Sequence, residues 1–264
     1  MAINPKKTRL FVGMRKSNEL VCMKIGEDAS LSIAERTSLL SDPCFVGTDH
    51  QGQYIFTTYY KAGQIAVHRW DEKNDSMTEV QRISAEPNSH SIWPDSRDRY
   101  VYVPHTGPNK IYLYEFERRT GTLMARTPPW IVPESHLEPR HLCFHPNLDF
   151  LYTINEGSST VSVYAHDKEA GTIINKQTAS TLPAAKNIED NLCAEIRISG
   201  DGRFLYASNR GHNSIACFSV ENPTGFVKLT ACTPAPAKPR SFDISPDGRY
   251  LYAAGLDTGE LAAY

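Results

Sequence analysis

His141 and Glu195 are the residues of this sequence best suited to proton-transfer chemistry, because they take the same position in successive copies of a repeated segment. The copies read "HPNLDFLYTIN", "SGDGRFLYASN" and "SPDGRYLYAAG". His141 and Glu195 precede the turn of their copies by the same interval, and Arg197 follows Glu195 on the same face of the strand. An imidazole and a carboxylate at one opening can perform acid–base catalysis. The neighbouring guanidinium favours the ionised form of Glu195, which suits a base.

Further polar residues take repeat positions that are expected to face the same opening. They are Arg15, His90, Arg140, Glu156, Arg210 and Arg240, with Asn155 and Asn209 at the ends of second strands. Several guanidinium groups around one opening form an anion site, since each binds a carboxylate or phosphate through two parallel hydrogen bonds. The sequence therefore predicts a small anionic ligand, and we expect neither a metal nor a cofactor.

The elements that must position these residues are six copies of a four-stranded unit. An apolar–aromatic pair recurs every 45 to 54 residues, at Leu10-Phe11, Ile55-Phe56, Val101-Tyr102, Leu151-Tyr152, Leu205-Tyr206 and Leu251-Tyr252. In the fourth copy we expect strands at 140–145, 150–155, 160–167 and 171–180, separated by turns. Four short strands per copy without helical periodicity predict an all-β fold, a β-propeller of four-stranded blades. A β-sandwich would give no reason for copies in phase.

The organisation of the chain is expected to be one β-propeller domain over residues 1–264. The first copy begins almost within its second strand, and the last stops after its third. About one blade of a closed ring is then missing across the two termini, so the domain is expected to be clipped at both ends. Because first strands lie innermost in a propeller, the predicted residues should meet at one mouth of the central channel.

Composition narrows the class of partner. The chain has 28 basic and 30 acidic residues and a formal charge of −2, which argues against nucleic acid. No apolar run approaches the length of a membrane span. The start of the sequence has no signal-peptide core, so a cytoplasmic location is expected. The six cysteines include no C-x-x-C pair and are expected to be reduced, mostly buried thiols. A monomer is favoured. His105 is ambiguous, and the remaining histidines are expected at the surface or in turns: His50, His68, His136, His145, His166 and His212.

Two segments resemble the lactonase family of seven-bladed β-propellers. They are "EPRHLCFHPNLDFLYTINEGSSTVSVY" (138–164) and "AEIRISGDGRFLYASNRGHNSIACFSV" (194–220), and the resemblance covers nearly the whole chain. It implies that His141 and Glu195 form the catalytic pair. It also implies that Arg197 and Arg240, with Arg210 and Arg15, anchor the substrate. Six copies stand where the family has seven blades.

The activity that this resemblance implies is hydrolysis of 6-phospho-D-glucono-1,5-lactone, a step of the pentose phosphate pathway. Glu195 would activate a water molecule. His141 would bind the ester carbonyl or protonate the leaving ring oxygen, and the arginines would hold the phosphate. The sequence has no G-x-S-x-G element, so we expect no covalent intermediate.

Three other functions remain open at this point. The family also includes muconate-type lactonizing cycloisomerases, in which the arginines would bind substrate carboxylates. A metal-dependent lactonase could use Glu156, Asn155, Asn209 and Asp243 as ligands, although the number of arginines argues against a cation there. A non-catalytic propeller could instead bind an anionic peptide or metabolite without turnover.

Overall fold

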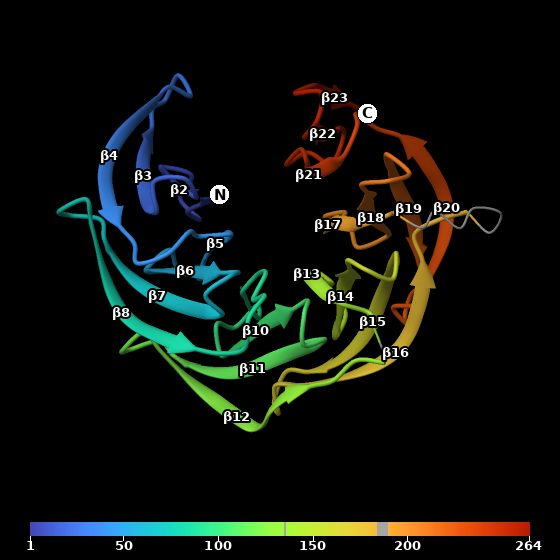
Figure 1. Ribbon diagram of the computed structural model, residues 1–264, viewed down its shortest axis with the longest axis horizontal. Coiled ribbons are helices and arrows are strands. Elements are labelled where there is room, and N and C mark those ends of the chain that lie inside the picture. Colours follow the sequence, from blue (N-terminus) through green and yellow to red (C-terminus); the bar gives the residue numbers. More distant parts are fainter. Residues whose placement is uncertain (135, 184–189) are drawn as a thin grey trace. The chain divides into compact units, whose positions relative to one another are not determined.

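Antiparallel β-strands form the regular secondary structure of the computed structural model, which describes residues 1–134, 136–183 and 190–264. The chain divides into two units, Met1–Val132 and Pro133–Tyr264, and each contains three sheets (Figure 1). The predicted all-β fold with six propeller blades is confirmed. Within the described ranges, no helix has the length and apolar character needed to cross a membrane.

The first unit contains three four-stranded sheets whose strands follow chain order within each sheet. The strands are β1 (Ala2–Ile3), β2 (Arg9–Met14), β3 (Glu19–Ile25) and β4 (Leu31–Ser38); β5 (Phe45–Thr48), β6 (Tyr54–Tyr59), β7 (Gln64–Asp71) and β8 (Ser76–Ser84); β9 (Trp93–Pro94), β10 (Tyr100–His105), β11 (Lys110–Glu117) and β12 (Thr122–Ile131). The first copy has a first strand after all, because Ala2 and Ile3 pair with Phe11 and Leu10. Two residues are too few to show an alternating pattern in the sequence.

The second unit contains two four-stranded sheets and one three-stranded sheet. The strands are β13 (Pro139–Phe144), β14 (Phe150–Asn155), β15 (Thr160–Asp167) and β16 (Thr172–Ser180); β17 (Cys193–Ile198), β18 (Phe204–Asn209), β19 (Ser214–Val220) and β20 (Val227–Pro234); β21 (Pro239–Ile244), β22 (Leu251–Gly255) and β23 (Leu261–Ala263). The strands expected for the fourth copy agree with β13 to β16 within one residue, and the last sheet stops after its third strand as expected.

In each unit, one pair of neighbouring sheets meets where an aromatic side chain packs on a glycine. In the first unit, a Cβ atom on Gly121 would clash with the ring of Tyr54. In the second unit, a Cβ atom on Gly225 would lie 2.7 Å from the ring of Phe150. Both glycines have positive φ, so the turn geometry and the close approach both disfavour a side chain there. In each unit the contact links a turn of one sheet to a second strand of its neighbour.

Buried histidines correct one expectation from the sequence. His68 and His166 lie in the third strands β7 and β15, where strand alternation turns them to the buried face. Burial lowers the pKa of His68 to about 4, and its Nε2 lies 3.1 Å from the Thr57 hydroxyl. His145 is also buried and accepts hydrogen bonds from the backbone N–H groups of Asn147 and Leu148, so it caps the β13–β14 turn.

Candidate active site

The first strands of the second unit carry the residues that the repeat phase singled out. β17 packs against β13 on one side and against β21 on the other. The register of each first strand shifts near its start: around Arg140 in β13, around Ala194 and Glu195 in β17, and around Arg240 in β21. Such bulges redirect a side chain and are frequent beside active sites. Here the bulge lets Arg140 and His141, which are consecutive, both reach groups of β17.

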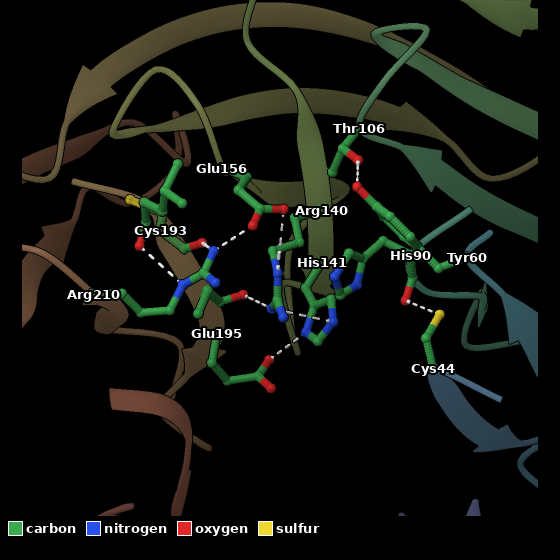
Figure 2. A network of polar contacts seen from close by, with 12 residues as sticks. Cys44, Tyr60, His90, Thr106, Arg140, His141, Glu156, Cys193, Glu195 and Arg210 are labelled. Carbon is green, nitrogen blue, oxygen red and sulfur yellow. Dashed lines mark hydrogen bonds and ion pairs between the residues drawn. The ribbon is translucent and has the colours of Figure 1, made fainter. Parts of the chain in front are cut away.

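His141 and Glu195 form a directly bonded pair. His141 Nδ1 lies 2.9 Å from Glu195 Oε1, and the two side chains are only 9% and 6% exposed. Figure 2 shows one carboxylate oxygen of Glu195 turned towards His141 and the other turned away from it. The same Oε1 accepts hydrogen bonds from Arg197 Nη1 at 2.5 Å and from the Ile196 backbone N–H at 3.1 Å. Three donors therefore converge on one oxygen of this carboxylate.

The partners of His141 define its tautomer. An ionised carboxylate only accepts hydrogen bonds, so Nδ1 of His141 carries the proton that is donated to Glu195. A guanidinium only donates, so Nε2 of His141 is the acceptor that faces Arg140 Nη1 at 3.4 Å. The imidazole is consequently neutral, with its proton on Nδ1 and its lone pair on Nε2.

Burial and charge act in opposite directions on the two members of the pair. Burial lowers the pKa of His141 to about 4, and Arg140 and Arg197 add to this effect while Glu195 opposes it. Burial by itself raises the pKa of Glu195, but Arg197, His141 and Arg140 outweigh it and hold that pKa well below its ordinary value. At neutral pH the pair is therefore a carboxylate and a neutral imidazole.

Arg140 is buried between the pair and a second carboxylate (Figure 2). Its Nη1 donates to the backbone carbonyl of Ala194, and its Nε lies 3.6 Å from Glu156 Oε2. Burial lowers the pKa of Arg140 to about 10, and Arg210 and Arg240 add to this effect while Glu156 and Glu195 oppose it. The guanidinium is thus still charged at neutral pH.

Arg210 is held by three groups of its own unit. It donates to Glu156, to the Cys193 carbonyl at 2.9 Å and to the Leu192 carbonyl at 3.2 Å (Figure 2). These contacts join the end of β14 to the start of β17. Arg210 therefore fixes Glu156, and Glu156 in turn lies against Arg140.

The third sheet of the unit contributes Arg240 and Asp243. Arg197 Nε lies 3.2 Å from Asp243 Oδ1, and Asp243 is largely exposed. Arg240 is half-buried at the bulge of β21. The arrangement thus places a neutral imidazole, three carboxylates and four guanidinium groups on three adjacent first strands and just after the second strands β14 and β18.

A comparison with known protein families identifies this architecture. The model of a family described as "Lactonase, 7-bladed beta-propeller" matches residues 1–264. The chain belongs to this lactonase family. A 6-phosphogluconolactonase of Pectobacterium carotovorum subsp. carotovorum (strain PC1) is 30% identical to the lactonase-family chain over 264 residues, which are 100% of the chain and 79% of that protein.

Solved structures show the same fold as this lactonase-family chain. The periplasmic gluconolactonase PpgL of Pseudomonas aeruginosa matches with a TM-score of 0.90 and 24% identity, over 99% of this chain and 79% of that one. A protein of Lactobacillus plantarum matches with a TM-score of 0.85 and 23% identity, over 100% and 82% of the two chains. At these identities, the structures support the fold of the lactonase-family chain.

Two of the predicted site residues lie in the first unit of the lactonase-family chain. Arg15 forms an ion pair with Asp42 at 2.6 Å and is about half-exposed. His90 is buried and packs edge-on against Tyr60, and its carbonyl accepts a hydrogen bond from Cys44 (Figure 2). The part of Arg15 and His90 in the site stays a prediction.

Asn155 and Asn209 are fully buried inside their own sheets. Asn155 Nδ2 donates to Thr160 and Ser162 at 2.9 Å, which closes the β14–β15 hairpin. Asn209 Oδ1 accepts hydrogen bonds from Thr181 and from two groups of the 191–193 segment. These contacts show both amides bracing the strands behind the site.

The cation site considered from the sequence is organised differently. Glu156 lies against Arg140 and Arg210, and Asp243 lies against Arg197. Among the described residues, no group of three or more His, Cys, Asp or Glu side chains is arranged to hold a metal ion. The carboxylates considered as cation ligands are thus paired with arginine side chains in this lactonase-family chain.

Sequence reasoning missed the backbone groups that complete the site. The Ala194 carbonyl accepts from Arg140, the Ile196 N–H donates to Glu195, and the Ser208 hydroxyl accepts from the Glu195 N–H at 3.0 Å. The only sequence signal was the Pro-Arg pair that starts β13 and β21. A proline is tolerated at the first residue of a strand or at a bulge, and so marks an irregular strand start.

Proposed function

We propose that the chain is a lactone hydrolase whose substrate is 6-phospho-D-glucono-1,5-lactone. The observation that carries the proposal is the neutral His141, held between Glu195 and Arg140 beside Arg197. The relationship to the family and to a relative named 6-phosphogluconolactonase supports lactone hydrolysis. The cluster of guanidinium groups supports an anionic lactone.

The geometry favours His141, and not Glu195, as the proton acceptor. Glu195 is a weak base, because three donors and a low pKa stabilise its ionised form. His141 is neutral and has its lone pair on Nε2. The contact with Arg140 is long, at 3.4 Å, so a water molecule that hydrogen-bonds to Nε2 beside it can pass its proton to Nε2 as it attacks the lactone carbonyl. Glu195 orients the ring, as the carboxylate does in a Ser–His–Asp triad.

The imidazolium that forms in this step is more acidic than an ordinary histidine side chain, because the pKa of His141 is lowered to about 4. It can therefore give the proton to the ring oxygen as the carbon–oxygen bond breaks, which yields the hydroxy acid and restores neutral His141. The positive charge of Arg197, close to the pair, can stabilise the negative charge on the carbonyl oxygen in the transition state. No covalent intermediate is needed.

Arg240 is the arginine that we assign to the phosphate of the substrate. Arg240 is half-buried at the bulge of β21, on the strand that follows the pair. A guanidinium there can bind a phosphate through two parallel hydrogen bonds.

The test is turnover of 6-phospho-D-glucono-1,5-lactone above its spontaneous hydrolysis, with unphosphorylated gluconolactone in parallel. His141→Gln should abolish most of the enzymatic rate, by about 10²-fold or more. His212→Gln is a matched control, because the His212 ring, in the turn between β18 and β19, bonds to Ser214 through Nδ1 at 2.7 Å. Turnover that is absent in the wild type, or equal in wild type and His141→Gln, contradicts the proposal.

The phosphate assignment has a separate test. Arg240→Gln should lower kcat/KM for the phosphorylated lactone by about 10-fold or more and leave the unphosphorylated lactone within about 2-fold. An equal loss for both substrates would show that Arg240 does not recognise the phosphate.

A cytoplasmic location is part of the proposal. All six cysteines lie within the described residues, and all six are thiols that form no disulfide. Reduced thiols are the rule in the cytoplasm, where glutathione and thioredoxin keep them so.

A further inference from the structure

We propose that Arg140 is a positioning residue that holds His141 in its neutral, Nδ1-protonated form from the Nε2 side, opposite Glu195. This inference rests on the proposed function for its catalytic meaning, but not for its structural content. It concerns a side chain for which the sequence suggested only a place among the anion-binding arginines.

The first observation is that each ring nitrogen of His141 has its own partner. Glu195 accepts from Nδ1 at 2.9 Å, and Arg140 Nη1 faces Nε2 at 3.4 Å (Figure 2). An acceptor on one side and a donor on the other permit only one neutral tautomer. The opposite tautomer would direct an N–H group at the guanidinium and leave a lone pair against the carboxylate.

The second observation is that Arg140 is fixed independently of His141. It is 2% exposed, its Nη1 donates to the Ala194 carbonyl, and its Nε lies 3.6 Å from Glu156. Arg210 holds Glu156 from the other side and is itself bonded to the carbonyls of Leu192 and Cys193. The position of the guanidinium is thus set by β14 and β17, not by the ring that it faces.

The third observation is electrostatic. The charged groups that act on His141 are Glu195 and Arg197 of β17 and Arg140 of its own strand, with Glu156 at the end of β14 acting through Arg140. Two of the three groups that act directly are cationic, and they oppose protonation of the ring, in the same direction as burial. Removing the charge of Arg140 should therefore ease protonation of His141.

For catalysis, Arg140 keeps His141 in the neutral form that can accept a proton, and it makes the protonated form short-lived. A ring that could flip or protonate at pH 6 to 7 would lose its lone pair on Nε2 in part of the molecules. With Arg140 in place, the imidazolium exists only during turnover and gives up its proton readily. The residue therefore acts on kcat and on the pH profile through His141, without touching the substrate.

The experiment compares Arg140→Gln, Arg140→Lys and the control Arg203→Gln. Arg203 is an exposed arginine that pairs with Asp201 in the β17–β18 turn. In Arg140→Gln, the pH at which activity falls to half on the acid side should rise by about one pH unit or more. Arg140→Lys, which keeps the charge, should show a smaller rise, and Arg203→Gln none. KM should change little in any of them.

The direct measurement is nitrogen NMR of histidine-labelled protein, with the His141 signals assigned by their loss in His141→Gln. We expect Nδ1–H and an unprotonated Nε2 in the wild type, and a higher titration midpoint in Arg140→Gln. This readout needs no substrate. If no lactone is hydrolysed but the NMR result is as expected, the proposed function fails and the positioning role stands.

Two results would overturn the proposal. One is an Nε2–H tautomer of His141 in the wild type, which can be observed even if the Arg140 variants do not fold. The other is a folded Arg140→Gln whose His141 titration and acid limb equal those of the wild type.

Discussion

Replacing the carboxylate of Glu195 should lower activity strongly while changing the size of the side chain very little. Glu195→Gln keeps the length and volume of the side chain and removes one negative charge. In the wild type, Glu195 Oε1 accepts hydrogen bonds from His141, Arg197 and the Ile196 backbone N–H. An amide oxygen can still accept from one or two of these donors, but its NH₂ group can turn towards His141 and favour the wrong tautomer.

The expected magnitude follows from this geometry. Replacing the carboxylate by an amide in a carboxylate–histidine pair of a serine protease lowers kcat by about 10⁴, because the imidazole adopts the wrong tautomer. Arg140 still favours the correct tautomer here, so we expect a loss of about 10² to 10⁴ in kcat, or about 2.7–5.4 kcal/mol of transition-state stabilisation. Breaking a buried ion pair costs about 3–5 kcal/mol in stability, and Asp243 remains as a partner for Arg197, so we expect the lower end or less.

The assay measures acid release from the lactone at constant pH, with the spontaneous rate subtracted, and thermal unfolding of the same samples. Asp201→Asn is the matched control, because Asp201 is an exposed carboxylate paired with an arginine two residues away. Glu195→Gln that folds and retains activity within about 2-fold of the wild type would refute the pair mechanism. An equal loss in Asp201→Asn would show that the effect is not specific to the site.

Three further predictions concern pH and packing. Activity should fall as pH drops through about 4, where His141 becomes protonated, and should be flat from about pH 6 to 8; a half-maximum near neutral pH would contradict this. The hydrogen bond from His50 to Asp98 raises the pKa of His50 above 6.5. The protonated His50 therefore stabilises the folded state below pH 6.5, and this contribution is lost as pH rises through the raised pKa. His50→Gln should therefore lower the free energy of unfolding in denaturant titrations more at about pH 5.5 than at about pH 8.5, by less than about 1 kcal/mol because His50 is exposed, and equal losses would refute the assignment. Gly225→Ala should destabilise the protein by about 1–3 kcal/mol in thermal unfolding, because Cβ would lie 2.7 Å from Phe150 at a positive φ, and an unchanged melting temperature would show that the ring moves without cost.

Much of the fold could be predicted because each strand shows its own alternation and each turn its own chemistry. The four strands of the fourth copy matched β13 to β16 within one residue. One exception is β1, whose two residues are too few to show an alternating pattern. Another is His68, a polar residue that the sequence placed at the surface or in a turn but that is buried. A histidine on the inner face of a third strand looks like a surface residue until the neighbouring sheet is known.

The sequence by itself determined which residues share a place in the repeat. It put His141 and Glu195 at equivalent points of successive first strands, because the period of the copies carries that information along the chain. The tertiary structure alone decided how the charges are partnered. Arg140 and Arg210 are held by backbone carbonyls of β17 and of the segment before it, and the strand bulges turn consecutive residues to one side. Those bonds join groups far apart in sequence, so no local pattern records them, and they set the proton positions on which the proposed chemistry depends.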